Sequence, residues 1–232
     1  MNDPLDGKHI IVTGGTGFLG SAIVRRFLDS GAICHVTWKF EAELDHFALR
    51  EHERVSLHQV DVTNEEQVNA FYQGGDSLWA SIHVVGGFQM GPIADISADQ
   101  FRSMFELNVM TCFLCCRGAV RKMRTGKGGG RIINIGARPA IQPTGGMIAY
   151  TTAKAGVTSL TQSLAEEVKG ENILVNAVLP SMMDTKANRS AMPDADFDKW
   201  PKVEEVAETI AFLASPANAL TSGALVPVYG RV

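Results

Sequence analysis

The chain lacks any apolar run that approaches the roughly 20 residues needed to span a bilayer. Its start, Met1–Lys8, carries acidic residues and no apolar stretch, whereas a secretory signal has a cationic start followed by an apolar segment. Basic stripes are absent too, because lysine and arginine are scattered and the formal net charge is −4. Such a chain cannot neutralise phosphates along a duplex. These absences predict a cytoplasmic protein that binds a small molecule rather than a membrane or nucleic acid.

Cysteine is scarce, with four residues in 232, which argues against a disulfide framework. Cys112 and Cys115 form a C-x-x-C pair, but no second pair and no paired histidines complete a zinc site. Cys34 and Cys116 also lie in strongly apolar stretches. All four are typical of small buried hydrophobic side chains, so the sequence predicts no metal site.

Apolar residues are plentiful, at 45% of the chain against 20% charged, and 232 residues suit one domain, 1–232, with a large core. Short β-branched runs alternate with longer helical patterns, which is typical of an α/β protein with a doubly wound parallel sheet. The predicted strands are His9–Thr13, Ala32–Trp38, Arg54–Val60, Ser81–Val85, Arg131–Ile135, Ile173–Val178 and Ala224–Val228. The predicted helices are Phe18–Ser30, Glu65–Gln73, Ala98–Arg124, Met147–Lys169 and Val203–Ala214.

A glycine-rich turn joins the first predicted strand to the first predicted helix. Gly15, Gly17 and Gly20 have the G-x-G-x-x-G spacing, at which side chains would block the turn and the approach of backbone N–H groups to a pyrophosphate. The strand before and the helix after it favour a dinucleotide site over a tight structural turn. The expected cofactor contacts here are Gly14, Gly15, Thr16, Gly17, Phe18, Leu19 and Gly20.

The end of the second predicted strand bears on which cofactor binds. A carboxylate about 20 residues beyond the glycine motif would bind the ribose 2′-hydroxyl of NAD. The strand instead ends at Trp38, and Lys39 follows it, with Glu41 close by. An uncharged residue followed by a cation suits a ribose 2′-phosphate, although Lys39 could equally be a solvated loop lysine. We therefore expect NADP(H) to be favoured over NAD(H).

Tyr150 and Lys154 stand at i and i+4 in the helical pattern Met147–Lys169, so they share a helix face. An ammonium beside a phenol favours the phenolate and lowers a pKa that is ordinarily near 10. A tyrosine tuned in this way can donate a proton to a substrate as hydride arrives. Such a pair is usually only a surface pair, but the glycine turn in the same chain favours catalysis.

Together these motifs resemble the short-chain dehydrogenase/reductase family over nearly the whole chain: Thr13-Gly14, Asp61-Val62, Asn108 within a long helix, Tyr150 to Lys154, Asn176 to Pro180, and Thr185. The resemblance implies a single Rossmann domain with a seven-stranded, mainly parallel sheet and helices on both faces. It implies that Tyr150 is the general acid, that Lys154 binds the nicotinamide ribose and tunes the tyrosine, and that Asn108 holds a water of the proton relay. The further implied cofactor contacts are Trp38, Lys39, Asp61, Val62, Val85, Gly86, Gly87, Ile135, Pro180, Ser181, Met183 and Thr185.

One departure from the family pattern concerns the substrate. The family usually has a serine thirteen residues before its tyrosine to polarise a carbonyl, and that position here is Ala137. Residues 143–150 and 178–200 resemble dihydropteridine reductases, a branch that also lacks the serine. The resemblance implies hydride transfer to a quinonoid or similarly conjugated ring, which needs protonation by Tyr150 more than a second carbonyl donor. Ser181 is a possible stand-in for the serine.

Residues 182–200 follow a predicted strand and carry Met, Phe and Trp among charged residues, which suits a lid over an aromatic substrate as well as an ordinary connection. The expected substrate contacts are Phe88, Gln89, Ala137, Arg138 and Trp200. Two alternatives stay open: a carbonyl reductase of the 3-oxoacyl type, and a non-catalytic regulatory protein that binds a nicotinamide cofactor. Against the second, a pure sensor needs no Tyr150, Lys154 or Asn108. The resemblance also implies a homodimer or homotetramer, joined by the helices around Asn108 and Lys154.

Overall fold

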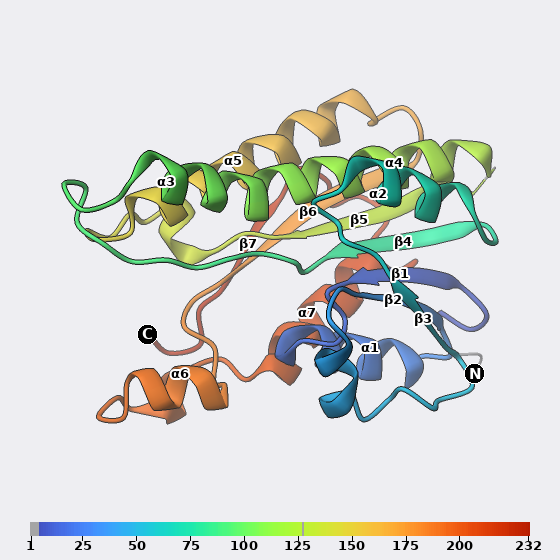
Figure 1. The fold of residues 1–232 in the computed structure, drawn as a ribbon. Helices are drawn as coiled ribbons and strands as arrows, with labels where there is room; N and C mark the ends of the chain where they lie inside the picture. The colour runs from blue at the N-terminus through green and yellow to red at the C-terminus, as the bar shows by residue number, and fades with distance from the viewer. Residues whose placement is uncertain (1–4, 127) are drawn as a thin grey trace.

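The computed structural model describes residues 5–126 and 128–232, which contain one seven-stranded sheet (Figure 1). All strands pair in parallel, in the order β3-β2-β1-β4-β5-β6-β7. The strands are β1 (His9–Thr13), β2 (Ile33–Trp38), β3 (Val55–Gln59), β4 (Leu78–His83), β5 (Gly130–Ile135), β6 (Ile173–Pro180) and β7 (Leu225–Val228). The strand order reverses between β1 and β4, so a ligand crevice is expected beyond their carboxyl ends. The predicted doubly wound α/β fold is confirmed.

Helices cover both faces of the sheet (Figure 1). On one face lie α1 (Phe18–Leu28) and α7 (Val203–Ala214), and on the other lie α2 (Glu65–Gln73), α4 (Thr111–Thr125) and α5 (Ile148–Glu167). The short helices α3 (Ala98–Phe105) and α6 (Lys186–Ala191) lie beyond the carboxyl ends of the strands. Within the described residues, no helix is both long and apolar enough to cross a membrane.

The sheet divides the apolar side chains into two cores, because successive side chains of a strand point to opposite faces. In β1, Ile10 and Val12 pack in the core under α1 and α7, while Ile11 packs in the core under α2 and α4. Strand β5 alternates in the same way and is buried throughout. Each fully buried isoleucine contributes roughly 1.5–3 kcal/mol of hydrophobic free energy, so the central strands hold a firm platform under the loops at their carboxyl ends.

Two predicted boundaries are wrong in ways that matter for the crevice. The fourth strand is Leu78–His83 rather than Ser81–Val85, because the chain leaves the sheet after His83 and Val84 and Val85 begin a long loop. The helix predicted from Ala98 to Arg124 contains a π-helical turn, Glu106–Met110, between α3 and α4. Three short 3-10 helices, Glu41–His46, Arg138–Ala140 and Phe197–Lys199, complete the connections.

Candidate active site

The structure brings three predicted catalytic residues to the loop that follows β4. Lys154 is 6% exposed, and its Nζ donates to the carbonyl of Ile135 at 2.8 Å. A Cβ atom placed on Gly86 would lie 2.7 Å from Asn108 Oδ1 and 3.2 Å from Lys154 Nζ. Glycine at position 86 is therefore what allows the loop backbone to pass directly over both side chains.

Asn108 is buried in the π-helical turn and holds the β4 loop in place. Its Nδ2 donates to the carbonyls of Gly87 at 3.1 Å and Met104 at 2.9 Å, and its Oδ1 accepts from the Gly87 N–H at 3.3 Å. Turns of π-helix are frequent at functional sites because they shift side chains away from regular helical positions. The role of Asn108 in holding a relay water stays a prediction.

Tyr150 lies in the first turn of α5 with its ring set edge-on to Phe88, at 4.9 Å between centroids and 83° between planes. Burial raises the pKa of Tyr150 to about 12. Burial also lowers the pKa of Lys154 to about 8, and its Nζ lies 6.0 Å from the Tyr150 ring centroid. The expectation that the Lys154 amine lowers the pKa of Tyr150 is wrong for the chain by itself, because burial causes the shift and raises this pKa. A phenol with this pKa keeps its proton at neutral pH but is a weaker acid than a free tyrosine.

The position of the missing serine is apolar in the structure as well. Ala137 follows β5, is 5% exposed, and brings no hydroxyl to the site. The possible stand-in, Ser181, donates its Oγ hydrogen to the carbonyl of Tyr229 at 2.8 Å. Its proton is thus already committed within the protein.

Tyr229, just beyond β7, is a polar residue that the sequence reasoning missed, since no motif surrounds it. Its ring lies 5.0 Å from the guanidinium of Arg138, whose Nε donates to Gln142. The Tyr229 hydroxyl is buried and has no hydrogen-bond partner among the described residues. Leaving such a group unpaired costs about 1–3 kcal/mol, so it is a free donor next to a predicted substrate contact.

The glycine turn has the close backbone approaches that its spacing predicts. Gly14 has φ +65°, a conformation that favours glycine, and a Cβ there would lie 2.9 Å from Val85. A Cβ on Gly20 would lie 2.2 Å from the carbonyl oxygen of Gly14, which is impossible without rearrangement. Gly17 precedes α1, and no side chain among the described residues caps that helix start. Backbone N–H groups there fit the phosphates of a dinucleotide.

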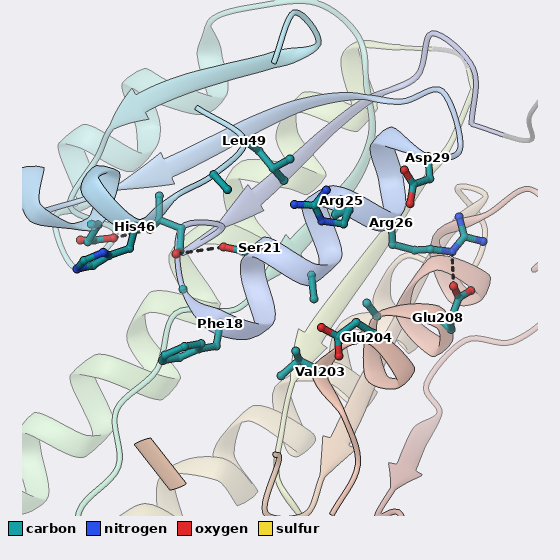
Figure 2. Close-up of a pocket in the computed structure, with 16 residues that line it drawn as sticks. Phe18, Ser21, Arg25, Arg26, Asp29, His46, Leu49, Val203, Glu204 and Glu208 are labelled. Atoms are coloured by element: carbon teal, nitrogen blue, oxygen red, sulfur yellow. Dashed lines mark hydrogen bonds and ion pairs between the residues drawn. The ribbon is translucent and has the colours of Figure 1, made fainter. Parts of the chain in front are cut away.

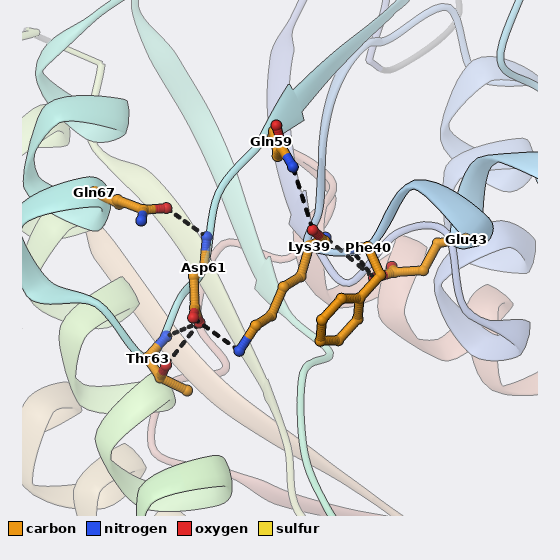
Figure 3. A network of polar contacts seen from close by, with 7 residues as sticks. All are labelled: Lys39, Phe40, Glu43, Gln59, Asp61, Thr63 and Gln67. Carbon is orange, nitrogen blue, oxygen red and sulfur yellow. Dashed lines mark hydrogen bonds and ion pairs between the residues drawn. The ribbon is translucent and has the colours of Figure 1, made fainter.

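The expected adenosine end of the cofactor site is a polar network (Figure 3). Lys39 Nζ lies 2.8 Å from Asp61 Oδ2, and Asp61 Oδ1 accepts from Thr63. Burial opposes ionisation of Asp61, but hydrogen bonds from Lys39 and Thr63 outweigh burial and lower its pKa. Lys39, which is expected to bind a ribose 2′-phosphate, therefore already pairs with Asp61, which is expected to contact the adenine.

Glu43 was not predicted and lies in the same network. Its Oε1 accepts from the N–H groups of Lys39 and Phe40, and its Oε2 accepts from Thr16 Oγ1 at 2.6 Å. No sequence signal points to it, because a capping box begins with Ser or Thr and Phe40 stands at that position. Glu43 places a carboxylate beside the glycine turn.

A hollow of about 540 Å³ opens along α1, between that helix, α7 and the 3-10 helix at 41–46 (Figure 2). It is lined by Thr16, Ser21 and Glu43 near the glycine turn and by Arg25 and Glu204 further along. Neither Tyr150 nor Lys154 lines it. This hollow therefore adjoins the expected cofactor site and is separate from the predicted catalytic residues.

The loops around Tyr150 are tied to one another. The N–H of Gly91 donates to the carbonyl of Gly146 at 2.8 Å, which joins the β4 loop to the segment before α5. Phe88 is 55% exposed beside Tyr150, as a substrate contact requires, and Gln89 is half-buried. Trp200, by contrast, is buried against Phe197, so it reaches a substrate only if its segment moves.

The remaining predicted contacts lie around the carboxyl ends of the strands. Thr185 caps α6 by accepting from the N–H of Asn188 at 3.2 Å, and α6 is held by the ion pair of Arg189 with Asp184. The predicted lid therefore contains a helix rather than an open loop. Leu19, Val62 and Ile135 are buried in the cores, Met183 packs against one core, Pro180 ends β6, and Trp38 ends β2 half-buried.

Comparison with known proteins agrees with this geometry. Residues 8–196 match a protein family described as short chain dehydrogenase. An NADPH-dependent aldehyde reductase-like protein of Arabidopsis thaliana is 27% identical, covering 98% of this chain and 94% of the relative. A 3-oxoacyl-[acyl-carrier-protein] reductase of Chlamydia trachomatis is 28% identical, covering 99% of each chain. The solved structure of a mutant short-chain dehydrogenase/reductase from Serratia marcescens is 28% identical over 98% of each chain, with a TM-score of 0.86.

Proposed function

The chain belongs to the short-chain dehydrogenase family and is an NAD(P)-dependent oxidoreductase, and from that premise we propose that it reduces a quinonoid or similarly conjugated substrate with NADPH. The observation that carries this proposal is the buried methyl group of Ala137, where the family usually has a serine hydroxyl. A ketone needs a donor there because charge develops on one oxygen. A conjugated acceptor spreads that charge over several atoms, so its reduction depends far less on a hydrogen-bond donor at position 137.

Tyr150 is the proton donor in this proposal. Its phenol is protonated at neutral pH, so the O–H can protonate the substrate atom on which negative charge collects. The edge-on ring of Phe88 gives a planar substrate an apolar wall beside that hydroxyl. The cofactor, when bound, supplies the hydride, and Lys154 and Asn108 hold its ribose and the loop around it.

A carbonyl reductase is the second candidate, favoured by a specific observation. The unpartnered hydroxyl of Tyr229 is a possible donor to a carbonyl oxygen in place of the missing serine. The names of the Arabidopsis and Chlamydia relatives are consistent with carbonyl reduction.

Substitution of Ala137 separates the two candidates. NADPH oxidation is followed with quinonoid dihydropterin, quinones, aldehydes and 3-oxoacyl thioesters for the parent and for Ala137→Ser. We expect turnover of the quinonoid compounds to change less than about twofold, and Tyr150→Phe to lower it by about 10²–10⁴-fold. Faster ketone turnover by Ala137→Ser, with the parent inactive on quinonoid compounds, would favour the carbonyl reductase.

The preference for NADP(H) is supported by Lys39 and by the absence of an acid at Trp38. Lys39 is partly exposed, so a 2′-phosphate can replace or share its contact with Asp61. We expect a lower KM for NADPH than for NADH, and about a 10–100-fold rise in the NADPH KM for Lys39→Ala, as for loss of a charged hydrogen bond. A lower KM for NADH in the parent would show the opposite preference. It would indicate that the carboxylate of Glu43, rather than Lys39, decides which cofactor binds.

The proposed self-association is supported by the outer face of α4 and α5. Phe113 of α4 is 40% exposed, with the guanidinium of Arg117 5.2 Å from its ring centroid, and a hollow beside it is lined by Leu160 and Leu164 of α5. We expect light scattering to give a dimer or tetramer for the parent and a smaller species for Phe113→Arg. Ile93→Arg, at an exposed loop residue, serves as the control.

A further inference from the structure

Three side chains with metal-binding atoms meet in the core beneath the β4 loop. His83 ends β4, and Cys112 and Cys116 lie one turn apart on α4. They are 4%, 5% and 2% exposed, and one ligand atom from each lies within 4.8 Å of the other two. The Cys112 and Cys116 sulfurs are 4.0 Å apart, and Cys116 Sγ is 3.5 Å from His83 Nδ1. We propose that this cluster binds one thiophilic divalent cation of the zinc class.

The spacing of the three atoms suits such an ion. Zinc binds sulfur at about 2.3 Å and imidazole nitrogen at about 2.0–2.1 Å, so atoms bound tetrahedrally to one ion lie roughly 3.3–3.8 Å apart. The separations of 4.0 and 3.5 Å in the structure are close to those values. The third separation, between the ligand atoms of Cys112 and His83, is within 4.8 Å, so these two side chains move closer together when an ion binds.

Asn134 of β5 brings a fourth polar atom, an amide oxygen, to the same point. Its Oδ1 lies 2.8 Å from His83 Nδ1 and 3.4 Å from Cys116 Sγ. The amide cannot easily turn round, because its Nδ2 donates to Thr161 Oγ1 at 2.9 Å. The two Cys and the His are three ligands of the kind that zinc prefers, and the Asn134 oxygen is within reach as a fourth.

The far side of the histidine ring has the partner that a metal ligand requires. A ligating imidazole donates its other N–H to a neighbouring group, and this fixes the ring and its tautomer. His83 Nε2 lies 2.9 Å from Ser81 Oγ and 3.4 Å from the Tyr72 hydroxyl. Both hydroxyls can accept that N–H, so ion binding at Nδ1 leaves no buried nitrogen unpaired.

Charge balance selects a divalent ion. Two thiolates carry a charge of −2, and a divalent cation between them gives a neutral centre, which avoids the large cost of a net charge in the core. A soft donor pair excludes magnesium and calcium, which take oxygen ligands. The ion would join β4 to α4, one helical turn from Asn108 and thus next to the β4 loop.

The sequence did not reveal this site, because the pair that converges is not the C-x-x-C pair. Cys115 points elsewhere and is absent from the cluster, while Cys112 and Cys116 share a helix face at i and i+4. The histidine comes from a strand 29 residues earlier, and only the fold brings it close.

Native mass spectrometry and cadmium titration test the proposal on the full chain. The protein is stripped with a chelator and titrated with Cd²⁺ alone, and thiolate-to-cadmium charge transfer is followed in the ultraviolet. We expect one ion per chain, displaced by Zn²⁺, and a raised thermal midpoint. Cys112→Ala and Cys116→Ala should each weaken binding at least 100-fold, and Ser81→Ala about 10-fold, as for partners of metal ligands.

Cys115→Ala is the matched control, since it removes an equally buried thiol from the same helix. It should bind Cd²⁺ as the parent does, and circular dichroism checks that all variants fold. Equal loss of binding in Cys112→Ala and Cys115→Ala would overturn the proposal. So would the absence of thiolate charge transfer in the folded parent at saturating Cd²⁺.

Discussion

At the scale of single residues, burial decides how the tyrosine and lysine behave. The i, i+4 spacing of Tyr150 and Lys154 was readable from the sequence, and so was their common helix face. The direction of the Tyr150 pKa shift was not readable, because it depends on how deeply the α5 turn sits under the β4 loop. The partners of Asn108 and the free hydroxyl of Tyr229 were likewise hidden, since each depends on contacts distant in the sequence.

The lowered pKa of Lys154 gives a prediction for the rate at alkaline pH. Burial brings this pKa down to about 8, so the ammonium is present below that pH and is lost as pH rises through it. If the charge holds the nicotinamide ribose, kcat/KM for the reduced cofactor should fall above about pH 8, because kcat/KM reports ionisations of the free enzyme.

Two variants check that the fall belongs to Lys154. In Lys154→Arg the side chain stays charged, so the residual kcat/KM should not decline near pH 8. In Lys154→Met it should be low at every pH. A parent profile that stays level from pH 7 to 10 would contradict the assignment.

At the scale of elements, the short β-branched runs identified every strand, because parallel strands buried on both faces are nearly continuous apolar segments. The end of β4 was misplaced, since Val84 and Val85 have strand propensity but lie in the loop. The π-helical turn was missed because it follows the same apolar pattern as the α-helix around it. Within the lid, α6 was missed because it is short and has no buried side chain.

The glycine turn gives a paired prediction, because two of its glycines have unlike surroundings. A Cβ on Gly20 would strike the Gly14 carbonyl, whereas a Cβ on Gly17 meets nothing nearer than 3.5 Å. We expect Gly20→Ala to lower the free energy of unfolding by about 1–3 kcal/mol or more, as overpacking does. Gly17→Ala should fold nearly as stably as the parent and lose affinity for NADPH instead.

Urea unfolding and fluorescence titration with NADPH measure the two effects separately. If both variants lost the same stability and the same affinity, the turn would not have the two distinct roles given to it.

At the scale of the whole molecule, a row of histidines crosses the half of the sheet away from Tyr150. His9, His35 and His58 lie on neighbouring strands β1, β2 and β3, with ring nitrogens 3.0 and 3.3 Å apart. Burial first, and then repulsion from His58 and His9, lowers the pKa of His35 to about 4, and burial lowers that of His58. The folded protein therefore holds the rings of His35 and His58 neutral where an unfolded chain would protonate them.

This difference predicts a loss of stability in mild acid. The unfolded histidines take up protons near pH 6.5, so stability is complete above that pH and falls as pH drops from about 6.5 towards 4. In His35→Gln, which cannot titrate, the fall should be shallower. The exposed residue His46 supplies the control, His46→Gln, and urea unfolding at pH 7, 6 and 5 compares the three slopes; identical slopes for both variants would contradict the prediction.

Five residues of π-helix, Glu106–Met110, join α3 to α4. An α-helix rotates about 100° per residue, so deleting one residue here to restore regular winding would swing α3 round by that angle. The helix would leave its packing against α5, and the amide of Asn108 would release Gly87. The position of Asn108 relative to the β4 loop therefore depends on the exact number of residues between α3 and α4.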